Sequence, residues 1–355
     1  MAENNSEGTA LCRRRAGGML LGRRGSGRRC DDGRRRSIGV RARWAGGSEW
    51  GGRVSREARL PGIAAWARVR DWRLGQLKNL SNAEMYLQSP LSADDILAYG
   101  IAHVALATGG RWRADGVGRT HRRPLHFIAE GAVVTPDDMM DRGAAAVADR
   151  GPVVIFDDDW FYMGSLMAEV AARAGREVTL VTSDVMVGSF SQNTLEQIRI
   201  QKQLLALGVR LLPNQALAGR GSDWLDLACT YSGTARRIDC GVLVPVTARL
   251  PVATLWDELK ARESEWADAG LKSVTRIGDC LAPGTIAAAN HSGHLYARTY
   301  GEVPDPDATP FRREDLARIY RDIARQVWAA VEGGAGAGPA PWNAWPMTRK
   351  RRISS

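Results

Sequence analysis

The chain has 355 residues, 44% of them hydrophobic and 25% charged, which is enough apolar material for roughly two globular domains. Its formal charge of +10 is concentrated at the two ends: residues 1–53 carry 13 arginines and a net +8, the run 349–352 adds +4, and the −2 left on residues 54–348 excludes a basic binding surface across the fold. No apolar run is long enough to span a membrane and the five cysteines include no CxxC pair, so we expect a soluble, cytoplasmic protein without a zinc site, an iron–sulfur cluster or a disulfide framework.

Three features are predicted in the first part of the chain. Apolar side chains at helical spacing predict a helix within residues 60–80, and a strand is expected at 83–86. The apolar run 101–110 ends in two glycines, which predicts a buried strand followed by a tight turn. The polar stretch that follows, up to residue 149, is predicted to be loop.

A regular alternation of strands and helices begins at Gly151. Each helix in it is followed by a glycine, as is common at helix ends. Strand, helix, strand, helix, strand is the order of a parallel sheet with crossover helices, so we expect an α/β unit here. The strands are expected at 152–156, 177–182 and 209–212 and the helices at 163–174 and 194–207, with further short strands within 225–246.

The last part of the chain predicts one strand, two helices and a tail. The strand at 273–277 ends in a turn and leads into a helix that continues to about residue 298, with Pro283 in its first turn. Apolar residues at helical spacing predict a second, amphipathic helix at 316–327. Glycine and proline predict a flexible linker between that helix and the basic end of the chain.

Three short glycine-containing signals stand where nucleotide-binding α/β folds place them. They are Glu-Trp-Gly-Gly-Arg at 49–53, Ala-Thr-Gly at 107–109 after a buried strand, and Gly-Asp at 278–279 before a helix. Glycine allows backbone to approach a ligand, and a helix start offers free N–H groups to a phosphate or a flavin carbonyl. The carboxylate of Asp279 is suited to accept hydrogen bonds from sugar or ribityl hydroxyls. Each signal alone is typical of a turn, but their order indicates a nucleotide site.

The order of these motifs resembles the carboxyl-terminal region of one flavoprotein family. Gly-Gly-Arg-Val, an arginine- and tryptophan-rich helix, Ala-Thr-Gly, an inserted strand–helix–strand unit and Ile-Gly-Asp-Cys-Leu-Ala-Pro-Gly-Thr-Ile occur in sequence within residues 49–323. This order is similar to that of the trimethylamine dehydrogenase and 2,4-dienoyl-CoA reductase family, the NADH:flavin oxidoreductases related to old yellow enzyme. The stretch 153–164 resembles the amine dehydrogenase branch in particular.

The resemblance implies an α/β fold of two Rossmann-like domains of the glutathione-reductase type, the second inserted in the first. An FAD- or ADP-type domain would comprise 49–149 and 270–332, and an NAD(P)H-type domain 150–269, with 333–355 as a flexible basic tail. In full-length members a barrel with FMN and a 4Fe–4S cluster precedes this region. We expect that barrel, and with it both of these cofactors, to be missing here. An electron-transfer flavoprotein or a separately encoded barrel are the partners that the resemblance implies.

The resemblance also assigns residues that would bind FAD or ADP. Glycines would allow close approach of the nucleotide, Arg53 would pair with a phosphate or with a neighbouring carboxylate, and Asp279 would hold hydroxyl groups. No general base, nucleophile or metal ligand is identifiable, and the five histidines show no metal spacing. The predicted nucleotide-binding residues are Gly51, Gly52, Arg53, Ala107, Thr108, Gly109, Gly278, Asp279, Gly284 and Thr285.

The inserted unit departs from a working dinucleotide motif. If Gly164 is the third glycine of G-x-G-x-x-G, Asp159 and Phe161 stand where the first two should be. Phe161 would block close approach, and the run Asp157 to Asp159 would repel a pyrophosphate. We therefore expect the inserted domain to bind no ligand. The alternative is NAD(P)H bound with Asp184 on a ribose.

Residues 1–48 depart from the family most strongly. Family members have a strand and G-x-G-x-x-G here, whereas this chain has Cys-Arg-Arg-Arg-Ala-Gly-Gly-Met at 12–19. Codons for these eight residues exist that, read one base later, encode Val-Gly-Ala-Gly-Pro-Ala-Gly. We hypothesise that about 11–48 is a frame-shifted remnant of the first βαβ unit, with the original frame restored before Gly51.

The sequence thus predicts the nucleotide-binding portion of an amine dehydrogenase-like or demethylase-like oxidoreductase, truncated and impaired in its first phosphate-binding motif. One alternative is a scaffold domain that binds no nucleotide. The other is a basic nucleic-acid-binding protein that uses the arginines between 13 and 43, although arginine clusters with little aromatic interleaving are weak evidence for that.

Sequencing the gene from upstream of the first codon through codon 60 tests the frame-shift hypothesis. We expect the codons for 12–19 to encode the glycine fingerprint in a shifted frame. Codons that cannot yield it in either other frame would reject the hypothesis.

Overall fold

The computed structural model describes residues 8–12, 39–43 and 50–300, all of which belong to one compact unit, Met1–Tyr300. The helix predicted at 316–327, the linker, the basic tail and most of 1–48 lie outside the described residues. Within 1–48, the segments 8–12 and 39–43 are strands. The frame-shift hypothesis concerns the gene and stays a prediction.

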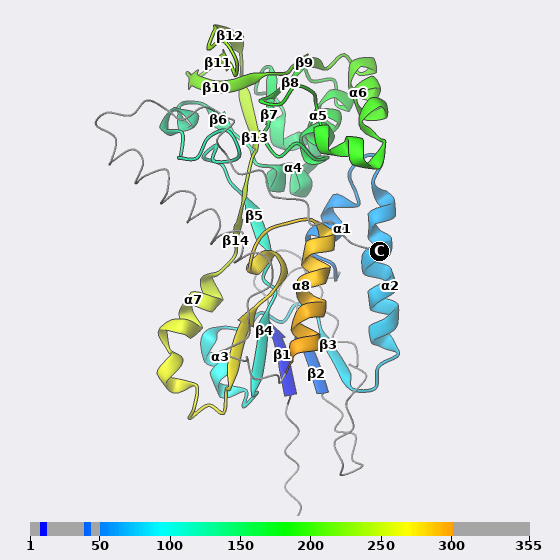
Figure 1. Ribbon diagram of the computed structural model, residues 1–355, viewed down its shortest axis with the longest axis vertical. Coiled ribbons are helices and arrows are strands. Elements are labelled where there is room, and N and C mark those ends of the chain that lie inside the picture. Colours follow the sequence, from blue (N-terminus) through cyan, green and yellow to red (C-terminus); the bar gives the residue numbers. More distant parts are fainter. Residues whose placement is uncertain (1–7, 13–38, 44–49, 301–355) are drawn as a thin grey trace, which may run out of the picture. The chain divides into compact units, whose positions relative to one another are not determined.

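One sheet has five parallel strands whose spatial order reverses at its central strand (Figure 1). From β1 the chain adds β2 and β3 on one side, and β4 and then β15 on the other. Such a reversal creates a crevice at the carboxyl ends of the strands, where open α/β sheets bind ligands. In spatial order the strands are β15 (Ser273–Arg276), β4 (His103–Leu106), β1 (Gly8–Cys12), β2 (Gly39–Arg43) and β3 (Ala83–Tyr86).

A second parallel sheet is built from the middle of the chain. Its three inner strands are buried at every position, which explains their continuous runs of valine, isoleucine and leucine. Helices α5 (Met163–Arg173) and α6 (Gln197–Ala206) connect its strands. The strands are, in spatial order, β6 (Ala132–Val133), β13 (Val242–Val246), β7 (Val153–Asp157), β8 (Val178–Thr182) and β9 (Arg210–Leu212).

The remaining strands form two smaller antiparallel sheets. One has three strands, β10 (Gln215–Arg220), β11 (Trp224–Cys229) and β12 (Ala235–Asp239). The other pairs β5 (Gly110–Trp112), which follows β4, with β14 (Arg249–Pro251), which follows β13. This pair therefore connects the segments of the chain that build the two parallel sheets.

Short helices complete the described part of the chain. The α-helices not yet named are α1 (Arg53–Glu57), α2 (Ala67–Lys78), α3 (Ala93–Ala98), α4 (Pro136–Arg142), α7 (Thr254–Ala261) and α8 (Ile286–Thr299). Short 3₁₀ helices occur at Ala64–Trp66, His126–Glu130, Gly143–Val147, Ser189–Thr194, Glu263–Glu265 and Gly278–Cys280.

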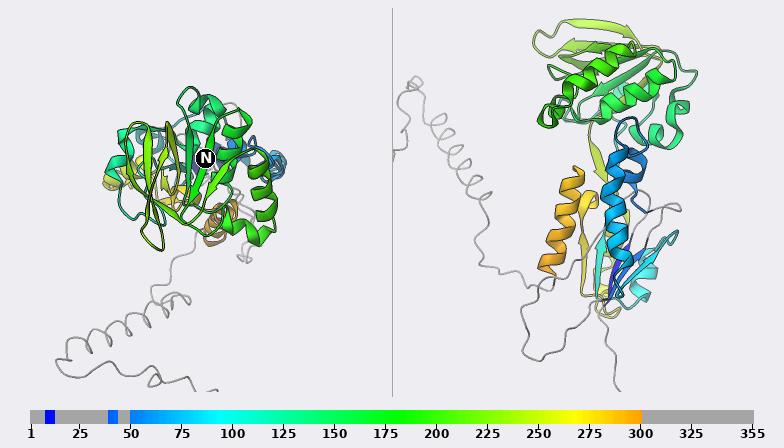
Figure 2. Two further views of the ribbon diagram at one scale, coloured as in Figure 1. Left: turned by 90° about the horizontal axis from the view of Figure 1, so that it is seen from above. Right: turned by 90° about the vertical axis from the view of Figure 1, so that its right-hand side faces the viewer.

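Alternate residues of each central strand pack on opposite faces, as the two-residue period of a strand requires. In the second sheet Val153 and Ile155 pack with residues of α4, α5 and α6, whereas Val154 and Phe156 pack with the three-stranded sheet. In the first sheet Leu106 packs with residues of α3 and α7. On the opposite face Ala105 of β4 packs with Ile277 and with Tyr296 of α8, and Figure 2 shows this helix alongside the sheet.

The predicted strands and crossover helices are confirmed within a few residues, but two expectations are wrong and several elements, among them α3, α7 and β14, were not predicted. Residues 111–149 are not all loop, because α4 begins there behind a capping box in which Thr135 and Asp138 exchange hydrogen bonds. Strand β10 was not expected. Pro283 precedes α8, whose N-cap is Thr285.

Gly164 is required where α5 meets the end of β7. A Cβ at this position would lie 2.4 Å from Cγ of Asp157, whereas a Cβ at Gly75, inside α2, would meet nothing within 4 Å. We expect Gly164→Ala to lower the free energy of unfolding by roughly 1–3 kcal/mol and Gly75→Ala to raise it by roughly 0.5–1 kcal/mol. Chemical denaturation of both variants measures this. Equal effects would contradict the close approach of α5 to Asp157.

Candidate functional site

An open pocket lies at the carboxyl ends of β4 and β15. Seven of the ten predicted nucleotide-binding residues line it, and Gly52, Thr108 and Gly284 do not. The start of α8 and one side of α2 supply the rest of its wall. The lining residues are Gly51, Arg53, Val54, Val69, Arg70, Arg73, Ala107, Gly109, Ile277, Gly278, Asp279, Thr285, Ile286, Ala289 and Asn290.

The backbone at Gly51 admits no side chain. Its φ is +114°, and a Cβ would lie 2.3 Å from Ser55 Oγ and 2.4 Å from Arg70 Cδ. Arg70 Nη1 in turn donates to Ser55 Oγ at 2.8 Å. The glycine therefore lets the turn before α1 fold against α2, and this brings the guanidinium groups of α2 to the pocket.

Arg53, the first residue of α1, is 8% exposed and takes the neighbouring-carboxylate alternative of the prediction. Its Nε lies 3.1 Å from Glu57 Oε1 and its Nη2 lies 2.8 Å from Asp279 Oδ2. Its Nη1 is buried and has no hydrogen-bond partner among the described residues. A buried charged donor without a partner costs free energy, and this one belongs to a residue that lines the pocket.

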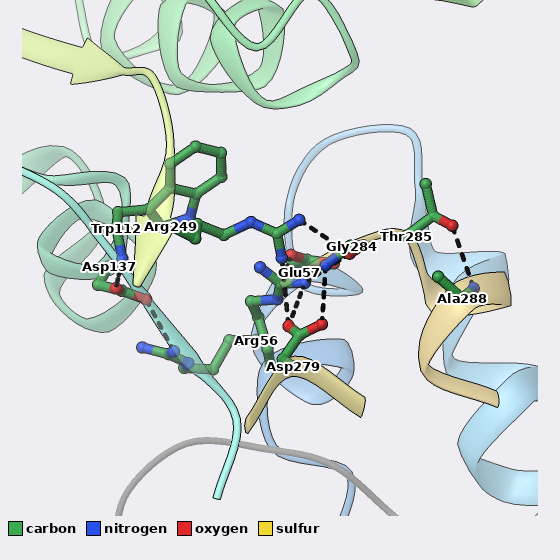
Figure 3. Close-up of polar contacts among 10 residues, drawn as sticks. Arg56, Glu57, Trp112, Asp137, Arg249, Asp279, Gly284, Thr285 and Ala288 are labelled. Atoms are coloured by element: carbon green, nitrogen blue, oxygen red, sulfur yellow. Dashed lines mark hydrogen bonds and ion pairs between the residues drawn. The ribbon is translucent and has the colours of Figure 1, made fainter. Parts of the chain in front are cut away.

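Asp279 is already engaged by the chain itself (Figure 3). Its Oδ2 is shared by Arg53 and by Arg249 Nη1, the latter at 3.2 Å, and its Oδ1 accepts from Gly284 N at 3.1 Å. The acceptor expected for ribose or ribityl hydroxyls thus has both oxygens occupied. Just beyond it, Thr285 caps α8 by accepting from Ala288 N at 3.2 Å.

Thr108 lies behind the pocket and not in its lining. Its Oγ1 is 2.5 Å from Val252 O and 2.8 Å from Sγ of Cys280. Thr108 and Cys280 are both buried. Thr108 therefore fixes the turn after β4 from behind, and Cys280 is a buried free thiol.

Four polar residues that the sequence did not reveal extend the cluster around Asp279 (Figure 3). Arg249 lies over the ring of Trp112 at 5.3 Å, and Trp112 N donates to Asp137 Oδ2 at 2.8 Å. Asp137 Oδ1 pairs with Arg56 Nη2 at 2.9 Å, which returns the chain of contacts to α1. The fourth residue, Glu57, is buried, and burial raises the pKa of its carboxyl while Arg53 opposes that rise.

The pocket lining also contains residues without a local sequence signal. Arg70, Arg73 and Asn290 were not predicted, because a single arginine or asparagine on a helix does not reveal which face it occupies in the fold. Arg73 Nη1 donates to Val69 O at 2.8 Å, and partial burial lowers the pKa of its guanidinium. The described lining therefore has three arginines against one carboxylate, which is itself paired.

The acidic run at the carboxyl end of β7 is bound by the chain as well. Asp158 accepts from Thr120 N at 2.8 Å, Thr120 Oγ1 at 2.5 Å and Ser183 Oγ at 2.8 Å. Burial raises the pKa of Asp159 to about 6. Asp157 is fully buried, and burial raises the pKa of its carboxyl to about 8. Its Oδ1 accepts from Trp160 N at 3.0 Å, but its Oδ2 lacks a partner in the part of the chain that is described.

Aromatic rings lie beside this acidic run. Phe161 stacks on Phe190 with ring centroids 4.5 Å apart, and Arg119 lies 4.9 Å above the ring of Trp160. Asp184, the residue considered for a ribose, accepts from Val185 N and from Ser189 Oγ. The start of α5 is thus surrounded by side chains that bind one another.

The described residues contain neither a candidate metal centre nor a candidate membrane-spanning helix. No group of three or more histidine, cysteine or acidic side chains among them is placed to hold a metal ion. None of their helices has the length and apolar character needed to cross a bilayer.

Known proteins share most of this chain. Residues 134–242 match the family described as OYE-like second alpha/beta domain. Dimethylamine dehydrogenase of Hyphomicrobium sp. (strain x) is 32% identical over 292 residues, which are 75% of this chain and 39% of that protein. The chain is homologous to amine dehydrogenases of the trimethylamine dehydrogenase type.

Solved structures agree with this homology. Histamine dehydrogenase from Rhizobium sp. 4-9 superimposes with a TM-score of 0.76 and 38% identity over 88% of this chain and 47% of that one. The 6-hydroxypseudooxynicotine amine oxidase from Pseudomonas geniculata N1 gives 0.73 and 34%, over 84% and 43%. The chain spans less than half the length of these homologues.

The raised pKa of Asp157 gives a pH-dependent prediction. Because the folded-state value of about 8 exceeds the ordinary 3.8, the stability linked to the neutral carboxyl is present at low pH and is lost as pH rises through 8. We expect Asp157→Asn to stabilise the protein at pH 9 by roughly 1–3 kcal/mol and to have little effect at pH 5.

Thermal unfolding at both pH values measures this difference, with the exposed Asp268→Asn as control. A stability change of equal size at pH 5 and pH 9 would show that Asp157 is ionised in the folded protein.

Proposed function

We propose that this chain is the FAD- or ADP-binding portion of an oxidoreductase of the flavin-dependent amine dehydrogenase type. The observation that carries the proposal is the pocket at the carboxyl ends of β4 and β15, which is lined by Arg53, a residue whose buried Nη1 has no partner among the described residues. It lies beside the point where the strand order reverses, the position at which α/β sheets bind nucleotides.

The residues of the pocket fit the ADP half that both nucleotides share. Gly51 gives the backbone close access, and the start of α8 offers free N–H groups and the positive end of its dipole. Arg53, Arg70 and Arg73 supply positive charge for a diphosphate. Bound FAD would add a redox-active flavin, whereas ADP would add binding energy alone.

Homology supports the reaction class. Two similar proteins are named as amine dehydrogenases, namely dimethylamine dehydrogenase and histamine dehydrogenase. We accordingly assign 49–149 and 270–332 to the FAD- or ADP-type domain and 150–269 to the inserted domain, with the amine chemistry carried out by a barrel and an electron-transfer flavoprotein as its acceptor.

We further infer that the inserted domain holds no nicotinamide nucleotide. The position of a pyrophosphate, at the start of α5, is bordered by the Phe161–Phe190 stack and by the carboxylates that follow β7. Asp158 there accepts two hydrogen bonds from Thr120 and one from Ser183, so its carboxylate is already engaged by the chain itself.

Titration of the purified protein with ADP, and its flavin absorbance after desalting, test the proposed function. We expect saturable binding, and we expect Arg53→Met to weaken it by about 10-fold or more, because a buried charge-assisted hydrogen bond is lost. Arg237→Met is the matched control, since Arg237 lies on the exposed strand β12 and pairs there with Asp226 of the neighbouring strand β11.

The other outcomes assign the chain to the alternatives. Absence of both ADP binding and retained flavin would favour the scaffold domain. Salt-sensitive binding to DNA in place of nucleotide binding would favour the nucleic-acid-binding protein.

A further inference from the structure

Arg249 reaches the pocket wall from a different part of the chain than any predicted residue. It begins β14, which follows β13 of the second sheet and pairs with β5. Its side chain is 13% exposed and packs over the ring of Trp112 at 5.3 Å. A guanidinium this enclosed retains its charge only with partners, and both partners lie in the loop before α8.

Arg249 binds both ends of that loop (Figure 3). Its Nη1 lies 3.2 Å from Asp279 Oδ2, and its Nη2 donates to Gly284 O at 2.8 Å. Gly284 N donates to Asp279 Oδ1 at 3.1 Å, which closes the loop internally. The guanidinium thus fixes the backbone that leads into α8, whose first residues line the pocket.

The charges around Asp279 make Arg249 necessary for binding an anion. Asp279 lines the pocket close to the helix start that would receive a phosphate, so its negative charge would repel that phosphate. Arg53 alone does not offset it, because Arg53 also pairs with Glu57. Within this group the guanidiniums of Arg53 and Arg249 balance the carboxylates of Asp279 and Glu57. Loss of Arg249 leaves Asp279 less neutralised and so reduces the positive charge that Arg70 and Arg73 give the pocket.

We propose that Arg249 is a positioning residue of the nucleotide pocket. It neutralises Asp279 and holds the loop 279–284, so that the start of α8 and the free Nη1 of Arg53 face a nucleotide diphosphate in a positive environment. The inference rests on the proposed function and adds a residue contributed by the strand that leaves the second sheet. Asp279, in this arrangement, is an anchor of the pocket wall.

Substitutions separate the charge role from a structural one. Asn at 279 keeps an oxygen for Gly284 N but has no charge, so it removes the need for Arg249. We expect Arg249→Met to weaken ADP binding by about 10-fold or more and Arg249→Lys to weaken it less, since Lys keeps the charge but cannot contact both Asp279 and Gly284. The double variant Arg249→Met with Asp279→Asn should recover most of the lost affinity.

The measurement is calorimetric titration of the full chain with ADP at low salt, with Arg237→Met as control and a thermal unfolding curve for every variant. Unchanged affinity in Arg249→Met would overturn the inference alone. A double variant that binds as weakly as the single one, or more weakly, would also overturn it, because the loss would then be structural. No ADP binding by the unsubstituted chain would overturn the proposed function and the inference with it.

Discussion

The carboxylate of Asp279 is the interaction on which the arrangement of the pocket depends. It receives Arg53 from the start of α1, Arg249 from the start of β14 and the backbone of Gly284 before α8. Charges that are about nine-tenths buried are tolerated only when paired, so each of these segments is held in place by the others. One donor of Arg53, the atom Nη1, has no acceptor among the described residues.

The two parallel sheets use the carboxyl ends of their strands in opposite ways. In the first sheet, small residues such as Ala107 and Gly109 and a set of arginines leave an open, cationic pocket. At the end of β7 in the second sheet, Asp158 is bound by Thr120 and Ser183 of the chain itself. Topology therefore places both edges in the position of a binding site, and the residues after each strand decide whether a ligand has room there.

The sequence predicted best what depends on neighbouring residues. Strands β7, β8 and β13 are buried on both faces, so their runs rich in valine and other apolar residues were visible, and glycines marked the turns that form the pocket. Helix α4 was missed although Thr135 and Asp138 form a capping box, because the helix is only 7 residues long. The contacts of Arg249 had no signal, since Trp112 and Asp279 are distant in sequence and only the fold brings them together.

Asp157 is a buried acidic residue that lies just before the positions of the dinucleotide motif and packs against Gly164 of α5. Gly164 has no side chain at the point where α5 passes Asp157. Such a close approach of helix to strand is what the third glycine of the motif provides. The carboxyl group fills the space beneath the helix, and burial keeps it neutral at pH 7, so no uncompensated charge is enclosed. The close approach of helix to strand is thus retained, while Asp159 and Phe161 stand where the first two glycines of the motif would leave the backbone N–H groups open to an anion.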